Sequence, residues 1–280
     1  MSLGFTLRGL GLWTPGFADP AAWSRRAVPG DRSPAGGEVP EGGDPTVTAP
    51  RAELLPAMMR RRTSLLTRMA AEVAAQAFAS AGIDRGEATV IYGSVYGEIR
   101  TTIDLLAALL DPAAPLSPTK FHNSVHNTAG GYVSIATQNR RGNAALTAGA
   151  ATLAMGLIEC AGLIAAGEGP ALLVIAEETL PEPLAAGRSW APLAAAFALD
   201  AIAADAGRAG SRDMSVRTCR LVQGSGGPAP GLPPALASNP CALALALVEL
   251  ALRPGPSTLA LEPGVVGGWC LEIAGPEAEA

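Results

Sequence analysis

Short apolar runs alternate with longer helical segments along the middle of this sequence, and that alternation limits the fold more than any other feature. The runs have the length and composition of buried strands, and apolar residues between them recur at helical spacing. Strands that alternate with helices are typical of α/β folds with an at least partly parallel sheet. The expected strands are 89–92, 143–149, 171–178 and 192–203, and a weaker alternation suggests a further strand at 5–13. The expected helices are 54–82, 128–140 and 151–167.

Composition favours one large folded unit. Hydrophobic residues make up 49% of the 280 residues and charged residues only 16%, so the chain can bury a sizeable core. We expect a single domain over 1–280, with its main part at 1–205 and a short tail at 206–280. Gly, Pro and acidic residues crowd 29–50, which predicts an exposed, flexible loop. The tail, rich in Pro and Gly, contains one apolar helix at Cys241–Leu252 and a strand near Trp269–Ile273.

Several classes of protein are disfavoured. A net charge of −5 without an extended basic run argues against nucleic-acid binding. The four cysteines are widely spaced without a CxxC pair, which gives no support to a zinc site or a disulfide framework. No signal peptide is visible, and the apolar stretches near 146–166 and 241–252 are better explained as buried helices than as membrane spans. We therefore expect a cytoplasmic protein.

The strongest candidate for chemistry is the strand, tight turn and apolar helix at 145–166. The turn reads Leu-Thr-Ala-Gly-Ala-Ala and places Gly149 at the expected start of the helix. Free N–H groups and partial positive charge at a helix N-terminus stabilise a thiolate or an oxyanion. This elbow is suited to an activated nucleophile, or to the binding of an anion or a carbonyl group.

Five segments, in this order, resemble the N-terminal half of the β-ketoacyl synthases. They are 55–82 with its arginine-rich start, the strand and turn VIYGSVYGE at 90–98, the stretch 124–149 that leads into the elbow, ALLVIAEE at 171–178, and PLAAAFALD at 192–200. The resemblance implies the thiolase fold, a layered α/β/α architecture, here with a shortened C-terminal part. In that family the stretch matching 124–149 contributes to a dimer interface.

The chain departs from this family where the family's chemistry lies. Gly149 stands where the family has its nucleophilic cysteine, and glycine cannot form an acyl-enzyme. Cys160 lies three helical turns downstream, about 16 Å away at 1.5 Å per residue, and is interpreted as a small buried hydrophobe. Both histidines, His122 and His126, precede the elbow, so the family's two C-terminal histidines have no counterpart. No catalytic residue is therefore expected.

Other residues in the sequence suggest a metal, hydrolase, carboxylate or phosphate site, but each also has a structural explanation. His122 and His126 form an HxxxH pair that could bind a metal on a helix, but Pro118 and the polar sequence FHNSVHN favour a loop, and no metal or other cofactor is expected. Ser94, or Ser124 with His126, could indicate a serine hydrolase, but the GxSxG elbow is absent, and the glycines around Ser94 are better explained by a tight turn and close packing. Glu177 and Glu178 are adjacent in a strand and point to opposite faces. The arginines at 60–62 suit a carrier protein or a phosphopantetheine phosphate, although a solvated helix face explains them as well.

The resemblance implies a non-catalytic subunit of the chain-length-factor type, as in aryl-polyene and related type II fatty-acid and polyketide systems. Such a subunit pairs with an active β-ketoacyl synthase, shapes the acyl tunnel, and meets an acyl carrier protein whose phosphopantetheine arm carries the acyl chain. The expected interface and tunnel residues are Asn123, His126, Asn127, Gly130, Gly131, Tyr132, Thr147, Ala148 and Gly149. Two alternatives remain open: a homodimer that binds acyl carrier protein or acyl thioesters without turnover, and an enzyme whose chemistry has moved to Cys160 or Ser124.

Overall fold

A computed structural model describes residues 2–26, 42–111, 113, 115–182, 184–202 and 216–275. Most of the expected loop at 29–50, and part of the tail, lie outside these residues. The strands are β1 (Leu3–Trp13), β2 (Thr89–Gly93), β3 (Asn143–Leu146), β4 (Ala171–Glu177), β5 (Leu193–Asp200), β6 (Arg217–Gln223), β7 (Ser257–Ala260) and β8 (Trp269–Ile273). The helices are α1 (Pro20–Ser24), α2 (Ala57–Arg60), α3 (Leu65–Ala81), α4 (Ile99–Leu110), α5 (Pro118–Asn123), α6 (Thr128–Thr137), the 3-10 turn η1 (Gly149–Ala151), α7 (Thr152–Ala165), α8 (Pro234–Ala237) and α9 (Ala242–Leu252).

One mixed sheet organises the described chain. Its eight strands run in the order β3-β2-β4-β5-β1-β6-β8-β7. β3, β2 and β4 are parallel to one another, whereas the pairs from β4 to β7 are antiparallel. The expectation of an α/β fold with a partly parallel sheet is therefore confirmed. Because β2 and β3 are parallel neighbours, the turns that follow them emerge at the same edge of the sheet.

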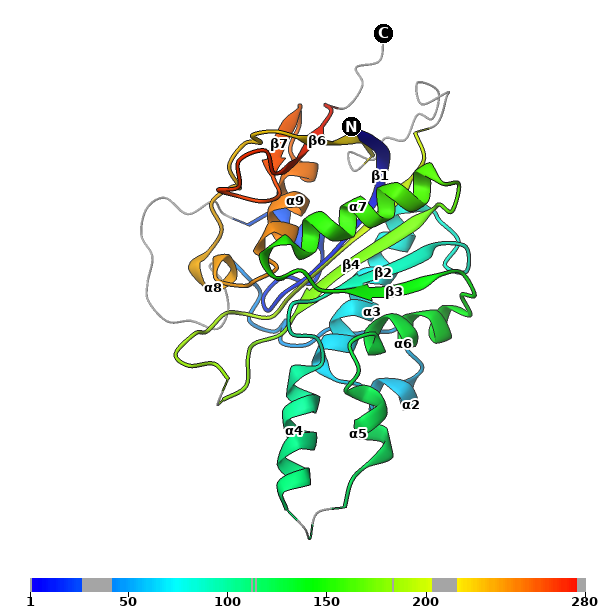
Figure 1. The fold of residues 1–280 in the computed structure, drawn as a ribbon, viewed down its shortest axis with the longest axis vertical. Helices are drawn as coiled ribbons and strands as arrows, with labels where there is room; N and C mark the ends of the chain where they lie inside the picture. Colours follow the sequence, from blue (N-terminus) through cyan, green and yellow to red (C-terminus); the bar gives the residue numbers. More distant parts are fainter. Residues whose placement is uncertain are drawn as a thin grey trace.

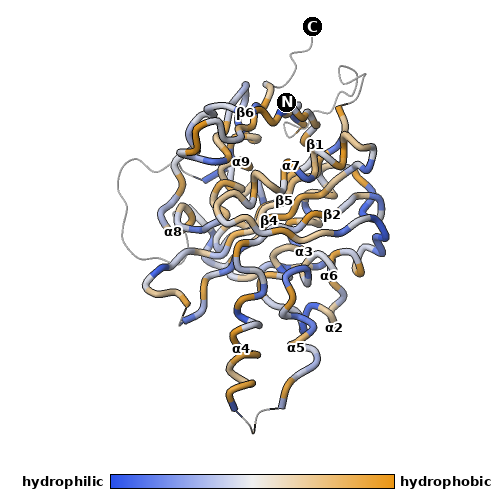
Figure 2. The backbone as a smooth tube through the Cα atoms, in the orientation of Figure 1, coloured by the Kyte–Doolittle hydropathy of each residue, from blue (hydrophilic) through white to orange (hydrophobic). Residues whose placement is uncertain are grey.

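Helices cover both faces of this sheet. α3 and α6 lie on one side, while α7 and α9 lie on the other (Figure 1). Alternate residues of β5 enter the two layers: Leu193 and Phe197 pack with α7 and α9, whereas the small Ala194 and Ala196 face α3. Apolar colour is concentrated along these central strands (Figure 2).

α3 crosses β1 at backbone distance because two glycines leave room for it. A Cβ at Gly11 would lie 2.1 Å from the carbonyl oxygen of Val73, and one at Gly9 would lie 2.4 Å from that of Ala77. β1 shifts register between Leu7 and Gly9, and its amides at Leu10 and Leu12 donate to Ser80 and Gln76 of α3. The abundance of Ala and Gly in the sequence thus serves close packing of helix on sheet.

Two predicted helices are shorter in the structure. The expected helix at 54–82 is interrupted, since α2 ends at Arg60 and α3 begins only after Ser64, whose hydroxyl accepts from the amide of Thr67. A left-handed Gly82 ends α3 where the sequence predicted. The helix expected to reach Arg140 ends at Thr137, because Gln138 adopts a left-handed conformation with φ of 55°.

The C-terminal part extends the same sheet. β6 pairs with β1, and β8 and β7 follow it outward. The apolar helix and the strand expected in this part correspond to α9 and β8, whereas β6 and β7 were not predicted. Leu221, Leu245 and Leu271 join the core that also contains residues of β1 and α7.

A helical hairpin leaves the body of the molecule. α4 and α5 project beyond the sheet and its covering helices (Figure 1). Several large apolar side chains on them are exposed, including Leu109 and Phe121, at 61% and 70%. Among the helices that the structure describes, none is long and apolar enough to cross a membrane.

Candidate functional site: an elbow without a nucleophile

The predicted elbow is present as a strand, a turn and a helix. β3 ends at Leu146, η1 begins at Gly149, and α7 starts at Thr152. The hydroxyl of Thr152 closes the turn, because it accepts from the amide of Ala148 at 3.0 Å and donates to the carbonyl oxygen of Gly149 at 2.7 Å. Gly149 has φ of 56°, and no atom lies within 4 Å of the position that its Cβ would occupy. The elbow is therefore open, and its geometry favours glycine.

The turn after β2 supports the elbow. Thr147 donates to the carbonyl oxygen of Val95 at 3.2 Å, and Nε2 of His126 lies 3.2 Å from the carbonyl oxygen of Leu146. The ring of His126 also packs against Gly97, where a Cβ would lie 2.4 Å from its Nδ1. The structure thus brings His126 and Thr147 together at the elbow, joined by the residues 94–97.

The remaining predicted residues lie on and beside α6. Tyr132 donates to Oδ1 of Asn123 at 2.9 Å, and Nδ2 of Asn123 donates to the carbonyl oxygen of Arg62 at 2.7 Å. Asn127 precedes α6, and its carbonyl oxygen accepts from the amide of Gly131. Gly130 leaves room for the side chain of Asn143 on β3. These residues join α5, α6 and the edge strand rather than surrounding one reacting atom.

The segment expected to be a loop around His122 is partly helical. Ser117 caps α5 and Pro118 occupies its first turn, so that His122 lies on this helix. α5 ends at Asn123, which separates His122 from His126, and the ring of His122 meets Tyr132 edge-on instead. Among the described residues no group of three or more His, Cys, Asp or Glu side chains is placed to hold a metal ion.

No relocated nucleophile is apparent among the described residues. All four thiols are free and buried, and burial raises the pKa of Cys219 to about 12 and that of Cys160 further. Ser94 is fully buried and donates to Glu177 at 3.1 Å. The hydroxyl of Ser124 donates to the carbonyl oxygen of Phe121, not to His126.

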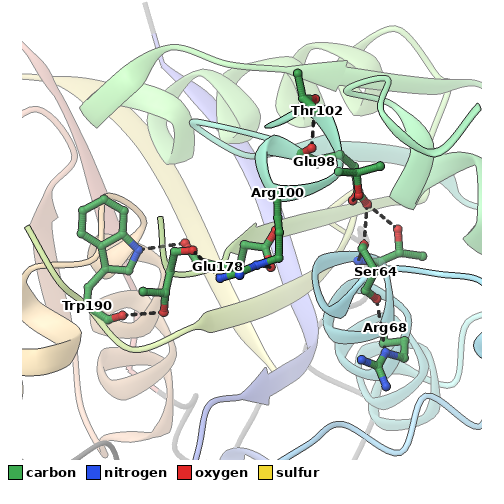
Figure 3. Close-up of polar contacts among 10 residues, drawn as sticks. Ser64, Arg68, Glu98, Arg100, Thr102, Glu178 and Trp190 are labelled. Atoms are coloured by element: carbon green, nitrogen blue, oxygen red, sulfur yellow. Dashed lines mark hydrogen bonds and ion pairs between the residues drawn. The ribbon is translucent and has the colours of Figure 1, made fainter. Parts of the chain in front are cut away.

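Three carboxyl groups near the 94–97 turn are buried, and the sequence predicted no joint role for them. Glu177 is the last residue of β4, and its Oε2 accepts from the amides of Val95 and Tyr96 at 2.6 and 3.1 Å. Glu178 follows it and meets Arg100, while Glu98 precedes α4 (Figure 3). Burial raises the pKa of Glu177 and of Glu178 to about 7. Glu98 carried no local sequence signal.

An apolar groove of about 480 Å³ lies between α4 and α5. Its lining residues are Thr102, Leu105, Leu106, Leu109, Leu116, Ser117, Pro118, Phe121 and Ser124. The groove was not predicted, although the apolar residues of 99–110 are a signal in the sequence that points to it.

The family model described as the N-terminal domain of β-ketoacyl synthases matches residues 37–224. The chain belongs to this family. No curated protein matches the sequence.

Solved structures share the fold over nearly the whole chain. A structure described as the ketosynthase ApeO in complex with its chain length factor ApeC from Xenorhabdus doucetiae contains a chain similar to this one, with a TM-score of 0.64 and 20% identity, over 98% of this chain and 100% of that chain. The ishigamide ketosynthase/chain length factor gives a TM-score of 0.62 at 13% identity, over 99% and 100%. The AntDE:AntF complex of a type II acyl carrier protein with its ketosynthase gives 0.63 at 9%, again over 99% and 100%. At such identities these structures establish the thiolase-like ketosynthase fold, as the sequence predicted.

Proposed function

We propose that this chain is a non-catalytic ketosynthase-like subunit, a chain-length factor that pairs with an active β-ketoacyl synthase in type II fatty-acid or polyketide synthesis. The observation that carries the proposal is the intact elbow with Gly149 at its turn. A strand, a capped helix and supporting contacts are kept there, while a side chain able to attack a thioester is absent at that position. The similarity to structures described as ketosynthase and chain-length-factor complexes supports the same role.

The proposed contact with the synthase uses β3 and α6. β3 pairs only with β2 and lies at one end of the described sheet, so its other edge is open to a second chain. α6 runs beside it and exposes 58% of Ile135. Gly130 and Gly131 keep the helix surface low, which favours close approach of backbones.

The groove between α4 and α5 is proposed to form part of the acyl tunnel. Its lining is almost entirely apolar, and its volume of about 480 Å³ suits a hydrocarbon chain rather than a polar ligand. Phe121 lines this groove and is more than two-thirds exposed in the isolated chain. An aryl-polyene-like product is the finer form of this proposal.

The partner that delivers the chain is proposed to be an acyl carrier protein. Arg61 and Arg62 are exposed between α2 and α3 in a protein of net charge −5, so they form a local basic surface. Basic side chains of this kind attract acidic helices and phosphate. We expect the complex to work in the cytoplasm.

Co-expression with candidate ketosynthases, followed by affinity capture and native mass spectrometry, tests the pairing. We expect a one-to-one heterodimer that Ile135→Glu disrupts, because a charge at the centre of an apolar contact loses its hydration. Val266→Glu is the matched control, since Val266 is fully exposed on the β7–β8 connection. Failure of every such ketosynthase to bind, or equal loss in both variants, would reject the pairing. A homodimer that binds acyl carrier protein unaided would favour the alternative binding role.

A product assay with the reconstituted pair tests the tunnel. Phe121→Ala enlarges the groove and is expected to lengthen the acyl product, whereas Leu110→Ala, at an 86% exposed position that does not line the groove, leaves the length unchanged. An unchanged product distribution in the Phe121 variant would remove the groove from the tunnel.

A further inference from the structure

Three carboxyl side chains are buried in one region of the protein, at the base of the α4–α5 hairpin. Glu98 comes from the residue before α4, and Glu177 and Glu178 come from the end of β4. All three are buried, with exposed fractions of 2%, 0% and 1%. They are close enough for the charge of Glu98, and less strongly that of Glu177, to raise the pKa of Glu178 in addition to the larger effect of burial.

Their hydrogen bonds connect the hairpin to the body of the protein. Oε1 of Glu98 accepts from the hydroxyls of Ser64 and Thr67, each at 2.7 Å, which joins the start of α4 to the start of α3 (Figure 3). Oε2 of Glu177 holds the 94–97 turn through a hydroxyl and two amides. That turn contacts the elbow through Thr147. One cluster thus connects the hairpin, the first long helix and the elbow.

These hydrogen bonds are too few to compensate a negative charge on all three carboxyl groups. Oε1 of Glu177 and Oε1 of Glu178 are buried without a hydrogen-bond partner among the described residues. Arg100 is the cation nearest the cluster, 3.7 Å from Oε2 of Glu178, and its side chain is 55% exposed. Three negative charges beside one half-solvated guanidinium cannot all be maintained in a buried site, so some of these carboxyl groups must hold protons.

The other ionisable groups around the cluster do not supply the missing positive charge. On β2 and at the start of α9 they are the Tyr92 hydroxyl and the Cys241 thiol, both neutral because burial raises the pKa of each. The neighbouring basic groups face elsewhere. Arg68 of α3 donates to the Ser64 carbonyl oxygen, and His126 lies against the Leu146 carbonyl oxygen. Arg188 donates to the Tyr96 hydroxyl and to the carbonyl oxygens of Leu184 and Ala185.

We propose that Glu98, Glu177 and Glu178 form a proton-controlled latch at the base of the α4–α5 hairpin. When the cluster keeps its protons, the hairpin and the 94–97 turn stay in the observed position. As protons leave, repulsion among the carboxylates favours opening of α4 into water, where each charge is solvated. Burial raises the pKa of Glu177 and of Glu178 to about 7, so the change falls near neutrality. This inference concerns the chain alone and does not depend on a ketosynthase partner.

Hydrogen exchange of the full chain, read by mass spectrometry at about pH 6 and pH 8 and corrected for the intrinsic rates, tests the latch. The amides of residues 99–110 are expected to lose protection at the higher pH by about tenfold for each carboxyl that ionises on opening. Glu178→Gln keeps the shape of the side chain without its charge, so the loss of protection between the two pH values is expected to be about tenfold smaller than in the wild-type chain. Glu182→Gln removes an exposed carboxylate of the following loop and keeps the wild-type response.

Two results would overturn the proposal. One is equal protection of residues 99–110 in the wild-type chain at both pH values, which needs no variant to fold. The other is a pH response in Glu178→Gln as large as that of Glu182→Gln. If Glu178→Gln does not fold, Glu98→Gln replaces it, and a wild-type response in that variant counts equally against the latch.

Discussion

Replacing Gly149 by alanine measures how strongly the elbow requires glycine. The residue has φ of 56°, a left-handed conformation that costs an L-residue about 1–2 kcal/mol. A methyl group would meet no atom within 4 Å, so no steric cost is added. Alanine also restricts the unfolded chain, which recovers about 0.4–1 kcal/mol. We expect Gly149→Ala to destabilise the isolated chain by about 1 kcal/mol, which lowers Tm by about 2–4 °C for a large domain.

Urea denaturation followed by circular dichroism gives this free energy of unfolding. Gly131→Ala is the matched control, because Gly131 lies inside α6 and a Cβ there would also meet nothing within 4 Å. Its helical backbone predicts the opposite sign, a gain of about 0.5–1 kcal/mol. A Gly149 variant as stable as the wild-type chain would mean that the turn is not left-handed, and the argument from the elbow's geometry would fall.

Gly149→Cys extends the test to chemistry. The position is exposed at the start of the α7 region, where N–H groups and the helix dipole favour a thiolate. We expect this thiol to react with iodoacetamide and with an acyl thioester probe, at a stability cost like that of alanine. Condensation activity is not expected, because His126 is already packed at the elbow and His122 lies away from it. Decarboxylative condensation by this variant alone would contradict the inference that the elbow lacks the histidine donors that the reaction needs.

Three further outcomes test the fold. Gly11→Ala should cost several kcal/mol, above the ~1–3 kcal/mol typical of overpacking, because its methyl group meets the Val73 carbonyl oxygen at 2.1 Å; a Tm within a few degrees of wild type would contradict the β1–α3 packing. The wild-type thiols should resist Ellman's reagent until the chain unfolds, since all four are buried, and rapid native labelling would contradict that burial. The free energy of unfolding should fall as pH rises from about 4.5 to 7, because Glu177 and Glu178 bind more protons folded than unfolded in that window; denaturation curves in Glu178→Gln should flatten this slope.

Local patterns in the sequence predicted the elements on which the elbow is built. β2, β4 and β5 are apolar runs bounded by polar or turn residues, and α3 ends at a glycine that adopts the expected left-handed conformation. The helical start at Ser117-Pro118 was equally readable, since a serine cap followed by proline is a common helix start, but the polar composition of FHNSVHN outweighed it. The sequence thus contains both signals, the helix start at Ser117-Pro118 and the polar composition of FHNSVHN, and the structure follows the first.

Other features depend on contacts that no local pattern encodes. β6 alternates buried and exposed residues, yet its inward positions include Arg217, whose Nε and Nη2 donate to the carbonyl oxygens of Ala251 and Arg253 at the end of α9. β7 has only four residues and is defined by its pairing with β8. The carboxyl cluster joins Glu98 to residues about eighty positions later, and single glutamates are ordinarily solvent-facing. Only the folded topology brings them together.

The geometry of the elbow also explains why glycine suits the proposed role of a subunit that does not react. The turn contains the left-handed Gly149 and is closed by Thr152, which hydrogen-bonds to both the Ala148 amide and the Gly149 carbonyl oxygen. Any side chain there is held in a strained conformation, which is useful when the side chain performs a reaction. A chain that contributes shape alone has no such use, and glycine removes the strain while the turn, the helix and the contacts of Thr147 and His126 stay in place. If the elbow serves only as a stable surface beside β3, the nucleophile can be lost while the elbow itself is retained.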